Sequence, residues 1–295
     1  MKYGHIGMLI VLLLWGSSFV SIKIAVGFIP PITMALIRFA VASALLWLWL
    51  KKKEPSSRLD KQDVLRMMAA GCLGVTLYFY FENSGVQLST ASNAALIASV
   101  IPILATLLDQ LIYKTRLTGL QWSGMAVAFA GTYLAITANG QVQFASAHFK
   151  GNMLIVCAMV TWSLYTLCNK SFRSQYSGLF MTTYQNLFGT LLLLPLSLTE
   201  YRQWGPIPAA VLLHVLFLAV FCSACCYLLY IYALRQLDVT VTTMYLNLVP
   251  IVGVVGGHLF LQESVLPLQL VGGAVVITGI VMVNVKPRRI KLQKN

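Results

Sequence analysis

The sequence predicts an all-α, polytopic membrane protein with ten transmembrane helices in two inverted five-helix repeats. Of its 295 residues, 58% are hydrophobic and 10% are charged, whereas a soluble domain carries about 25% charged residues. The mean hydropathy of the chain is +0.79. Its apolar runs are each close to the roughly 20 residues that a helix needs to cross about 30 Å of hydrocarbon. A spanning β-barrel would show short segments of alternating polarity instead.

An internal repeat is the second observation behind this prediction. Four residues recur, identical and without a gap, 148 positions later, as the pairs Pro102 and Pro250, Gln121 and Gln269, Gly124 and Gly272, and Gly131 and Gly279. At a shift of 147, four more pairs match, namely Gly4 and Gly151, Trp15 and Trp162, Lys23 and Lys170, and Met34 and Met181. Two homologous apolar halves typically enclose a substrate site near the bilayer midplane.

In the first half, apolar runs predict spans at residues 6–26, 32–50, 64–83, 91–113 and 120–138. The first run resembles a signal peptide, but it is too long and lacks a small-x-small cleavage site, so we expect it to remain as a helix. The fifth run carries Gly124 and Gly131, two turns apart, which permit close approach of another helix.

In the second half, the runs predict spans at residues 152–169, 179–198, 209–233, 239–261 and 268–285. The connections are short, so neighbouring helices should be antiparallel, and the long connection at 139–150 is the seam between the repeats. The expected organisation is a first repeat at 1–138, a connecting loop at 139–150, a second repeat at 151–286 and a basic cytoplasmic tail at 287–295.

The distribution of lysine and arginine predicts the orientation. One side has Lys23, Lys150 and Arg202, alongside three glutamates. The other side collects Lys2, Lys51, Lys52, Lys53, Arg58, Lys61, Lys114, Arg116, Lys170, Arg173, Arg235, Lys286, Arg288, Arg289, Lys291 and Lys294. Both termini are therefore expected in the cytoplasm. Because five spans per repeat is an odd number, the second repeat must enter the membrane from the opposite side, which favours alternating access.

The net charge of +13 raises the question of nucleic-acid binding. The positive charges sit in short interhelical loops and in the tail, as the positive-inside rule describes. We therefore expect the lipid bilayer, and no nucleic acid, as the partner of this chain.

Ionisable side chains within apolar spans are costly and usually face a cavity, a partner or the interface. Glu82, near the end of the third span, follows Tyr78 by four residues, so both lie on one helix face. Glu82 could bind a proton or a substrate ammonium, or it could be a structural ion-pair partner of Lys23 or Arg38. Arg38 lies deeper, and we expect it to point inward to a carboxylate of the substrate or the protein.

Aromatic and amide side chains at mid-span are further candidates. Trp15 and Trp162 correspond across the repeats and lie away from the interfaces where tryptophan is usually enriched. They could line a site for an aromatic or cationic ligand, although packing between helices is the alternative for each. The other candidates are Tyr78, Tyr165, Tyr227, Tyr245, Asn93 and Asn247.

Pro102 and Pro250 are predicted to interrupt the fourth and ninth helices at equivalent places, since proline removes a backbone donor and frees a carbonyl. Freed backbone groups are tolerated at depth only beside protein or a wet cavity. The two prolines therefore point to a transport path between these helices.

Neither a metal nor a cofactor is expected. Cys222, Cys225 and Cys226 lie close together but have no histidine or carboxylate on the same helix turn, so buried thiols are the favoured interpretation. No phosphate-binding loop is present, which argues against direct ATP drive.

The ordered motifs resemble the EamA-type permeases of the drug/metabolite transporter superfamily. They are WGSSF at 15–19 followed by Lys23 and Arg38, ASNAALI at 91–97 leading to Pro102, and Leu117-Thr118-(x)2-Gln121-(x)2-Gly124-(x)6-Gly131, repeated more loosely through Pro250, Glu263, Gln269, Gly272 and Gly279. One departure is Lys114-Thr115-Arg116, where the family usually has a Gly-Glu-Arg-like end to the fourth helix.

The resemblance implies a ten-helix secondary transporter of the plasma (inner) membrane, often an exporter of amino acids, metabolites or drugs. Its partners would be a small-molecule substrate and, for coupling, protons, and the oligomeric state is left open. An exchanger of phosphorylated sugars or nucleotide sugars would need several basic residues in the site, and mainly Arg38 is found. A membrane-embedded enzyme or a sensor is the alternative from another class, but no catalytic pair at matching depth and no soluble domain are evident.

Overall fold

The computed structural model describes residues 2–114, 117–138, 146–170, 172, 176–237, 245 and 248–284. Within these residues the chain is helical and contains no strand, as predicted. The first half consists of α1 (Lys2–Ala25), α2 (Pro31–Lys53), η1 (Lys61–Asp63), α3 (Val64–Gly71), η2 (Cys72–Leu77), α4 (Tyr78–Leu88), α5 (Ala91–Ala98), α6 (Ile101–Tyr113) and α7 (Gly119–Ile136).

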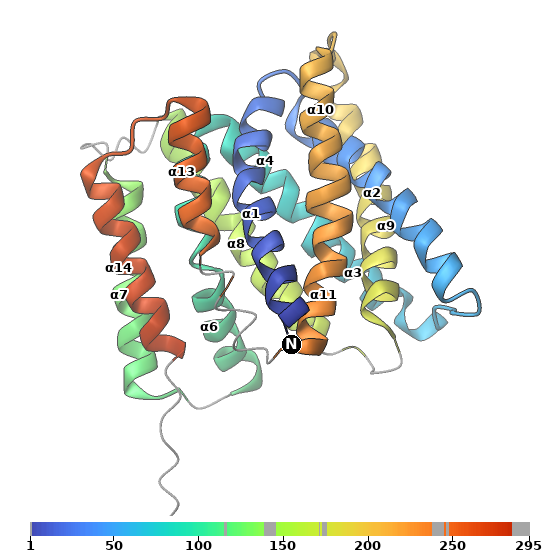
Figure 1. Ribbon diagram of the computed structural model, residues 1–295, viewed down its shortest axis with the longest axis horizontal. Helices are drawn as coiled ribbons and strands as arrows, with labels where there is room; N and C mark the ends of the chain where they lie inside the picture. Colours follow the sequence, from blue (N-terminus) through green and yellow to red (C-terminus); the bar gives the residue numbers. More distant parts are fainter. Residues whose placement is uncertain are drawn as a thin grey trace, which may run out of the picture.

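The second half follows the same order. It consists of α8 (Ala147–Lys170), α9 (Gly178–Ser197), η3 (Leu198–Gln203), α10 (Ala209–Phe217), η4 (Leu218–Cys225), α11 (Cys226–Gln236), α13 (Val249–Leu261) and α14 (Pro267–Asn284). The helices run back and forth between two ends of one bundle, with α7 and α14 paired at one edge (Figure 1).

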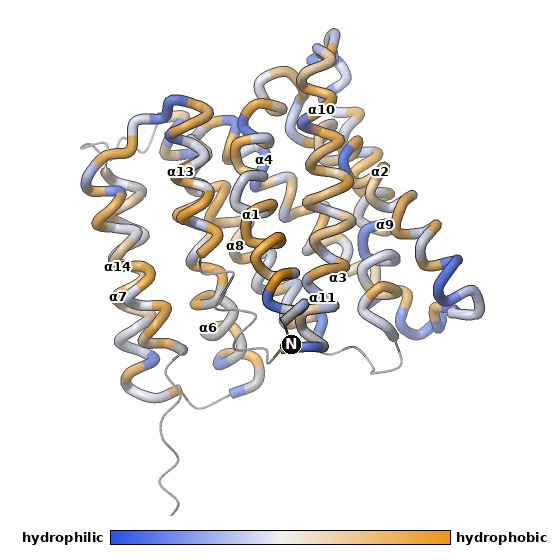
Figure 2. Tube along the Cα trace, viewed as in Figure 1, coloured by the Kyte–Doolittle hydropathy of each residue, from blue (hydrophilic) through white to orange (hydrophobic). Residues whose placement is uncertain are grey.

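The helices have the length and polarity of membrane spans. Among the described residues, six segments are long and apolar enough to cross a bilayer, namely Tyr3–Ala25, Pro31–Lys53, Lys61–Leu88, Ala147–Asn169, Gly178–Gln203 and Ala209–Tyr230. Two further apolar helices of this part of the chain, Val249–Leu261 and Pro267–Val283, are shorter. Apolar residues predominate along the helices and polar residues gather toward the ends of the bundle (Figure 2). The polytopic α-helical fold is confirmed, and the count of ten spans stays a prediction.

The third and eighth predicted spans each contain a π-helical stretch. In the first half, η2 joins α3 to α4 without a break, and in the second half η4 joins α10 to α11. The two stretches occupy equivalent places, because η4 contains the positions that lie 147 residues after η2. π-Helical turns often mark functional sites, and neither stretch was predicted from the sequence.

The recurring glutamines begin the fifth helix of each repeat. The Thr118 hydroxyl accepts from the backbone N–H of Gln121 (3.3 Å), and Gln121 Oε1 accepts from the N–H of Thr118 (2.9 Å), which together form a capping box. At the same place in the second repeat, Gln269 Oε1 accepts from the N–H of Leu266 (2.8 Å). The recurring glutamine therefore accepts a backbone N–H at the start of the fifth helix in both halves.

The recurring glycines bring the two repeats together about a two-fold axis. A Cβ on Gly124 would lie 2.8 Å from the Gly279 carbonyl oxygen, and one on Gly131 would lie 2.7 Å from that of Gly272. Each glycine thus meets the repeat counterpart of the other, as antiparallel, inverted helices require. Elsewhere, Ser43 Oγ and Thr190 Oγ1, which are 147 positions apart, hydrogen-bond to each other at 3.1 Å.

The two prolines act differently from the kink that the sequence predicts. The fourth span is broken between Ala98 and Ile101 into α5 and α6, and Pro102 lies in the first turn of α6. Pro250 likewise lies in the first turn of α13. In a first turn the missing N–H removes no intrahelical bond, so each proline starts a helix and does not bend a continuous one.

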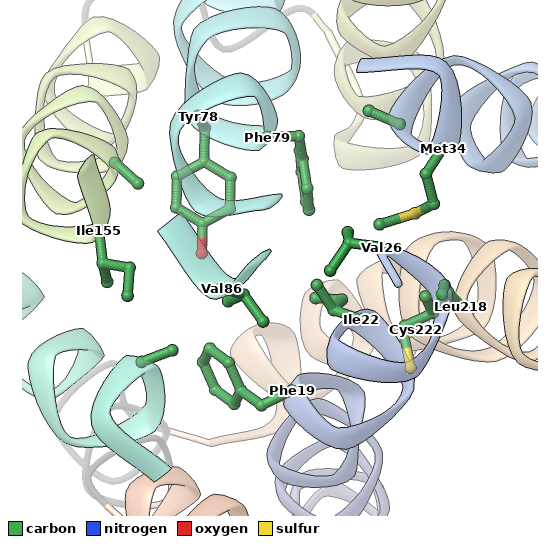
Figure 3. Packing of buried hydrophobic residues seen from close by; sticks show 14 of the residues in the cluster. Phe19, Ile22, Val26, Met34, Tyr78, Phe79, Val86, Ile155, Leu218 and Cys222 are labelled. Carbon is green, nitrogen blue, oxygen red and sulfur yellow. The ribbon is translucent and has the colours of Figure 1, made fainter. Parts of the chain in front are cut away.

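The main hydrophobic core lies between the halves. Side chains of α1, α2, α4, α8 and η4 converge there, including Phe19, Met34, Phe79, Ile155 and Leu218 (Figure 3). This core fixes the helices that carry most of the candidate site residues.

Candidate functional site

An aromatic cluster joins the two repeats. The Trp162 ring lies 4.9 Å from the ring of Tyr78 and 6.5 Å from that of Tyr227, measured between centroids. The repeat counterpart Trp15 lies 5.9 Å from Tyr227. Tyr165 extends the cluster at 5.1 Å from Trp162. Five of the predicted aromatic residues, from α1, α4, α8 and α11, are therefore brought together.

Buried polar groups adjoin this cluster. The Tyr78 hydroxyl donates to Glu82 Oε1 at 2.7 Å, as their spacing of four residues suggests. Arg38 Nε donates to Ser223 Oγ at 2.7 Å, and its guanidinium lies 4.5 Å from the centroid of the Phe79 ring. Arg38 and Glu82 are each 4% exposed.

Two atoms of these polar side chains make no hydrogen bond with the described residues. Among the described residues, Nη1 of Arg38 and Oε2 of Glu82 have no hydrogen-bond partner. The described side chains also include no salt bridge between Arg38 and Glu82, although the guanidinium acts electrostatically on the carboxyl. The ion pair that the sequence suggested as one role of Glu82 is thus replaced by the bond from Tyr78. A free donor and a free acceptor are left in a buried setting, where unpaired polar groups are costly.

The π-helical stretches place these groups. Tyr78 follows η2 directly, and Tyr227 comes second after η4. The Trp15 indole N–H donates to the Cys222 carbonyl oxygen in η4 at 2.9 Å, and Arg38 bonds to Ser223 in the same stretch. The first repeat therefore holds the η4 stretch of the second.

Two predicted residues, Asn93 and Tyr245, lie in other contacts than those of the aromatic cluster. Asn93 takes part in a separate polar network at the end of the bundle where α4 ends and α8 begins, and donates toward His148 Nε2 at 3.0 Å. Tyr245 hydrogen-bonds to His5 Nδ1 at 2.9 Å and packs beside α1 and α11. Asn247 lies outside the described residues.

The sequence analysis missed several contributing residues. Tyr230 adds an aromatic ring 5.7 Å from Trp15, and its position three residues after Tyr227 could have indicated this. Ser223 gave no such signal. Glu263 is also missing from the predicted site residues; its carboxylate accepts from the N–H groups of Ala91 (2.8 Å) and Ser92 (2.9 Å) and caps α5.

Glu200 caps α2 in the same way, and Glu54 binds the N-cap residue of α9 at the opposite end of the α2–α9 pair. The Glu200 carboxylate accepts from the N–H groups of Ile32 (3.1 Å) and Thr33 (2.7 Å) at the start of α2. Glu54, after α2, accepts from the hydroxyl of Ser177, the residue before α9. Carboxylates at helix N-termini are stabilising, so these contacts lock the two repeats together at both ends.

A cavity of about 200 Å³ lies away from this site, between α5, α6, α7 and α8. Its lining is apolar and includes Val100 at the helix break, Phe129, Tyr133 and Met159. Within the described part of the chain, no three His, Cys, Asp or Glu side chains are arranged to hold a metal ion.

Comparison with known proteins gives one family match in each half of the chain. The EamA-like transporter family matches residues 2–137 and 149–285. A protein of Archaeoglobus fulgidus named as an uncharacterized transporter is 26% identical over 286 residues, covering 96% of this chain and 97% of its own. A probable terminal-alkyne amino-acid exporter of Streptantibioticus cattleyicolor is 28% identical, covering 92% of this chain and 89% of its own. A crystal structure with 17% identity aligns with a TM-score of 0.67 over 96% of both chains, which shows the shared fold.

Proposed function

Because this chain belongs to the EamA-like transporter family, we propose that it is a secondary active transporter that exports small metabolites, amino acids or drugs by alternating access. The observation that carries the proposal is a buried donor and a buried acceptor, both unused, beside an aromatic cluster that draws on both repeats. A site shared by inverted repeats can be exposed to either side by rocking one repeat against the other.

The proposed repeats are residues 1–138 and 151–286, joined by the connecting segment at 139–150, whose residues from Ala147 onward belong to α8. The glycine contacts between α7 and α14 support this division, since each glycine meets the counterpart of the other, and Ser43 contacts Thr190, the residue 147 positions later. We place the protein in the plasma (inner) membrane with both termini in the cytoplasm, on the strength of the lysine and arginine distribution. The end of the bundle that carries the loop at 139–150 then faces outward.

The chemistry of the site favours a zwitterion with an apolar or aromatic side chain. A substrate carboxylate would accept from Nη1 of Arg38, and a substrate ammonium would donate to Oε2 of Glu82. The rings of Trp15, Trp162 and Tyr227 would contact the apolar part of the substrate, and they also favour a cation over their faces. Amino acids meet all three requirements.

Glu82 is also the proposed carrier of the coupling proton in this site. Uptake into proteoliposomes of a panel of radiolabelled amino acids tests the proposal, with the Glu82→Gln variant beside the wild type. We expect saturable uptake of at least one compound by the wild type. In Glu82→Gln we expect a loss of roughly 10- to 150-fold in apparent affinity, equivalent to about 1.5–3 kcal/mol for a hydrogen bond to a charged group, together with loss of the pH dependence of flux.

Tyr78→Phe is the matched control, because it removes the bond to Glu82 and leaves the carboxyl in place. It should keep the pH dependence of uptake. Unchanged flux and unchanged pH dependence in Glu82→Gln would assign this glutamate a scaffold role. Absence of saturable uptake of every compound by folded wild-type protein would contradict the transport proposal itself.

A further inference from the structure

A network of amide and imidazole groups closes the end of the bundle opposite the chain's N-terminus. Asn93 on α5 contacts His148 Nε2 on α8 at 3.0 Å and Asn152 Oδ1 on α8 at 3.4 Å. Gln269 on α14 donates to Asn93 Oδ1 at 2.5 Å, and Ser89 donates to Asn152 Oδ1 at 2.5 Å. The network therefore ties Ser89 and Asn93 of the first repeat to α8, through His148 and Asn152, and to α14, through Gln269.

The backbone determines which way the amides of Gln269 and Asn93 point. The N–H of Leu266 can only donate, so the atom of Gln269 that faces it at 2.8 Å is the carbonyl oxygen. The amide nitrogen of Gln269 then faces Asn93, which must present its own oxygen. Consequently the amide nitrogen of Asn93 faces His148, and Nε2 of this histidine must accept. An imidazole accepts at Nε2 only when it is neutral and carries its proton on Nδ1.

The charged groups described around His148 do not replace its imidazole as the acceptor for the Asn93 amide. Lys23 on α1 and Glu263 before α14 both act electrostatically on the imidazole, and Lys150 lies on the same helix. The Lys23 ammonium already donates to the carbonyl oxygens of Val86 (2.8 Å) and Gln87 (3.1 Å) at the end of α4. The Glu263 carboxylate is bound to the start of α5. A proton added to Nε2 would place N–H against N–H at Asn93 and a second positive charge near Lys23.

We propose that His148 is a proton-binding site that controls closure of this end of the bundle. In its neutral form the imidazole accepts from Asn93 and holds α8 against α5. Protonation of Nε2 removes the acceptor and separates the two helices, while Glu263 keeps α5 attached to α13 and α14. His148 is partly exposed, so the proton comes from the adjoining aqueous phase. This inference rests on the proposed orientation only for identifying that phase as the outer one.

Distance measurement between spin labels tests the proposal without any substrate. The labels are attached to Lys150→Cys on α8 and Ser264→Cys beside Glu263, both exposed, in protein whose six native cysteines have been replaced. Measurements at pH 5 and pH 8 bracket the ordinary titration range of histidine, about pH 5–8. We expect a longer-distance population that appears at pH 5 and is absent at pH 8.

Three variants make the result specific. His148→Gln keeps a neutral acceptor and should show the short distance at both pH values. Asn93→Asp supplies an acceptor for protonated His148 and should suppress or reverse the response. His258→Gln, at another exposed histidine near the same end, should behave as the parent protein. A distance that does not change with pH in the parent protein, or a pH response that persists in His148→Gln, would overturn the proposal. Neither outcome would affect the uptake assay, which tests transport separately.

Discussion

Replacement of Arg38 by methionine is expected to lower the apparent affinity of uptake strongly while leaving the protein folded. The guanidinium is 4% exposed, is held by Ser223 and Phe79, and has an unused Nη1 beside the aromatic cluster. A carboxylate bound there would gain a charge-assisted hydrogen bond, which contributes about 1.5–3 kcal/mol. Methionine fills a similar volume with an unbranched apolar chain, so the helix packing should survive.

The measurement is the apparent affinity for the transported amino acid in proteoliposomes, together with the Tm of the purified protein. A decrease of roughly 10- to 150-fold in affinity at an unchanged Tm is the expected result. Arg38→Lys is the control, because it keeps the positive charge but loses the planar fork that binds a carboxylate in two places. It should restore part of the affinity. Wild-type affinity in Arg38→Met would exclude this arginine from the substrate site.

Replacement of Gly131 by alanine should destabilise the protein, against the usual effect of this substitution. Within a helix, glycine is normally worse than alanine by roughly 0.5–1 kcal/mol. Here the new Cβ would lie 2.6 Å from the backbone nitrogen of Val276 and 2.7 Å from the Gly272 carbonyl oxygen. Neither backbone atom can move without shifting α14. The helices must separate, and overpacking of this kind costs about 1–3 kcal/mol or more.

Gly119→Ala is the matched control on the same helix, because no atom lies within 4 Å of the Cβ position at Gly119. We expect the Tm of Gly131→Ala to fall by roughly 5 °C, and that of Gly119→Ala to stay level or rise. Equal Tm values for the two variants would show that α7 and α14 do not approach as closely as described.

The sequence predicted those parts of the site that follow from helix periodicity and from the repeat. Tyr78 and Glu82 are one turn apart, so their contact follows from helix geometry alone. Trp15 and Trp162 are repeat counterparts, and a two-fold arrangement places both beside the interface between the halves. The glycines likewise predicted that α7 approaches another helix closely, and the structure shows that this helix is α14.

Other parts depend on the depth and rotation of each helix, which one sequence does not encode. Asn93 and Tyr245 are polar or aromatic residues within predicted apolar spans, as the cluster residues are. They nevertheless lie in separate networks, with His148 and His5. The cap that Glu263 places on α5 joins residues more than 170 positions apart. The stretches η2 and η4 have no marker residue, because a π-helical turn is a choice of backbone hydrogen bonds rather than of side chains.

Labelling from one side of the membrane tests the inverted arrangement of the repeats most directly. Ser56, after α2, and Gln203, at the end of η3, are exposed residues at equivalent places, 147 positions apart. Each is changed to cysteine in turn, in a background with the native cysteines replaced, and intact cells are treated with a membrane-impermeant maleimide. Inverted repeats predict that Gln203→Cys reacts and that Ser56→Cys reacts only after the membrane is permeabilised. Reaction of both positions from the outside, or of neither, would contradict the inversion on which alternating access around the Arg38–Glu82 site depends.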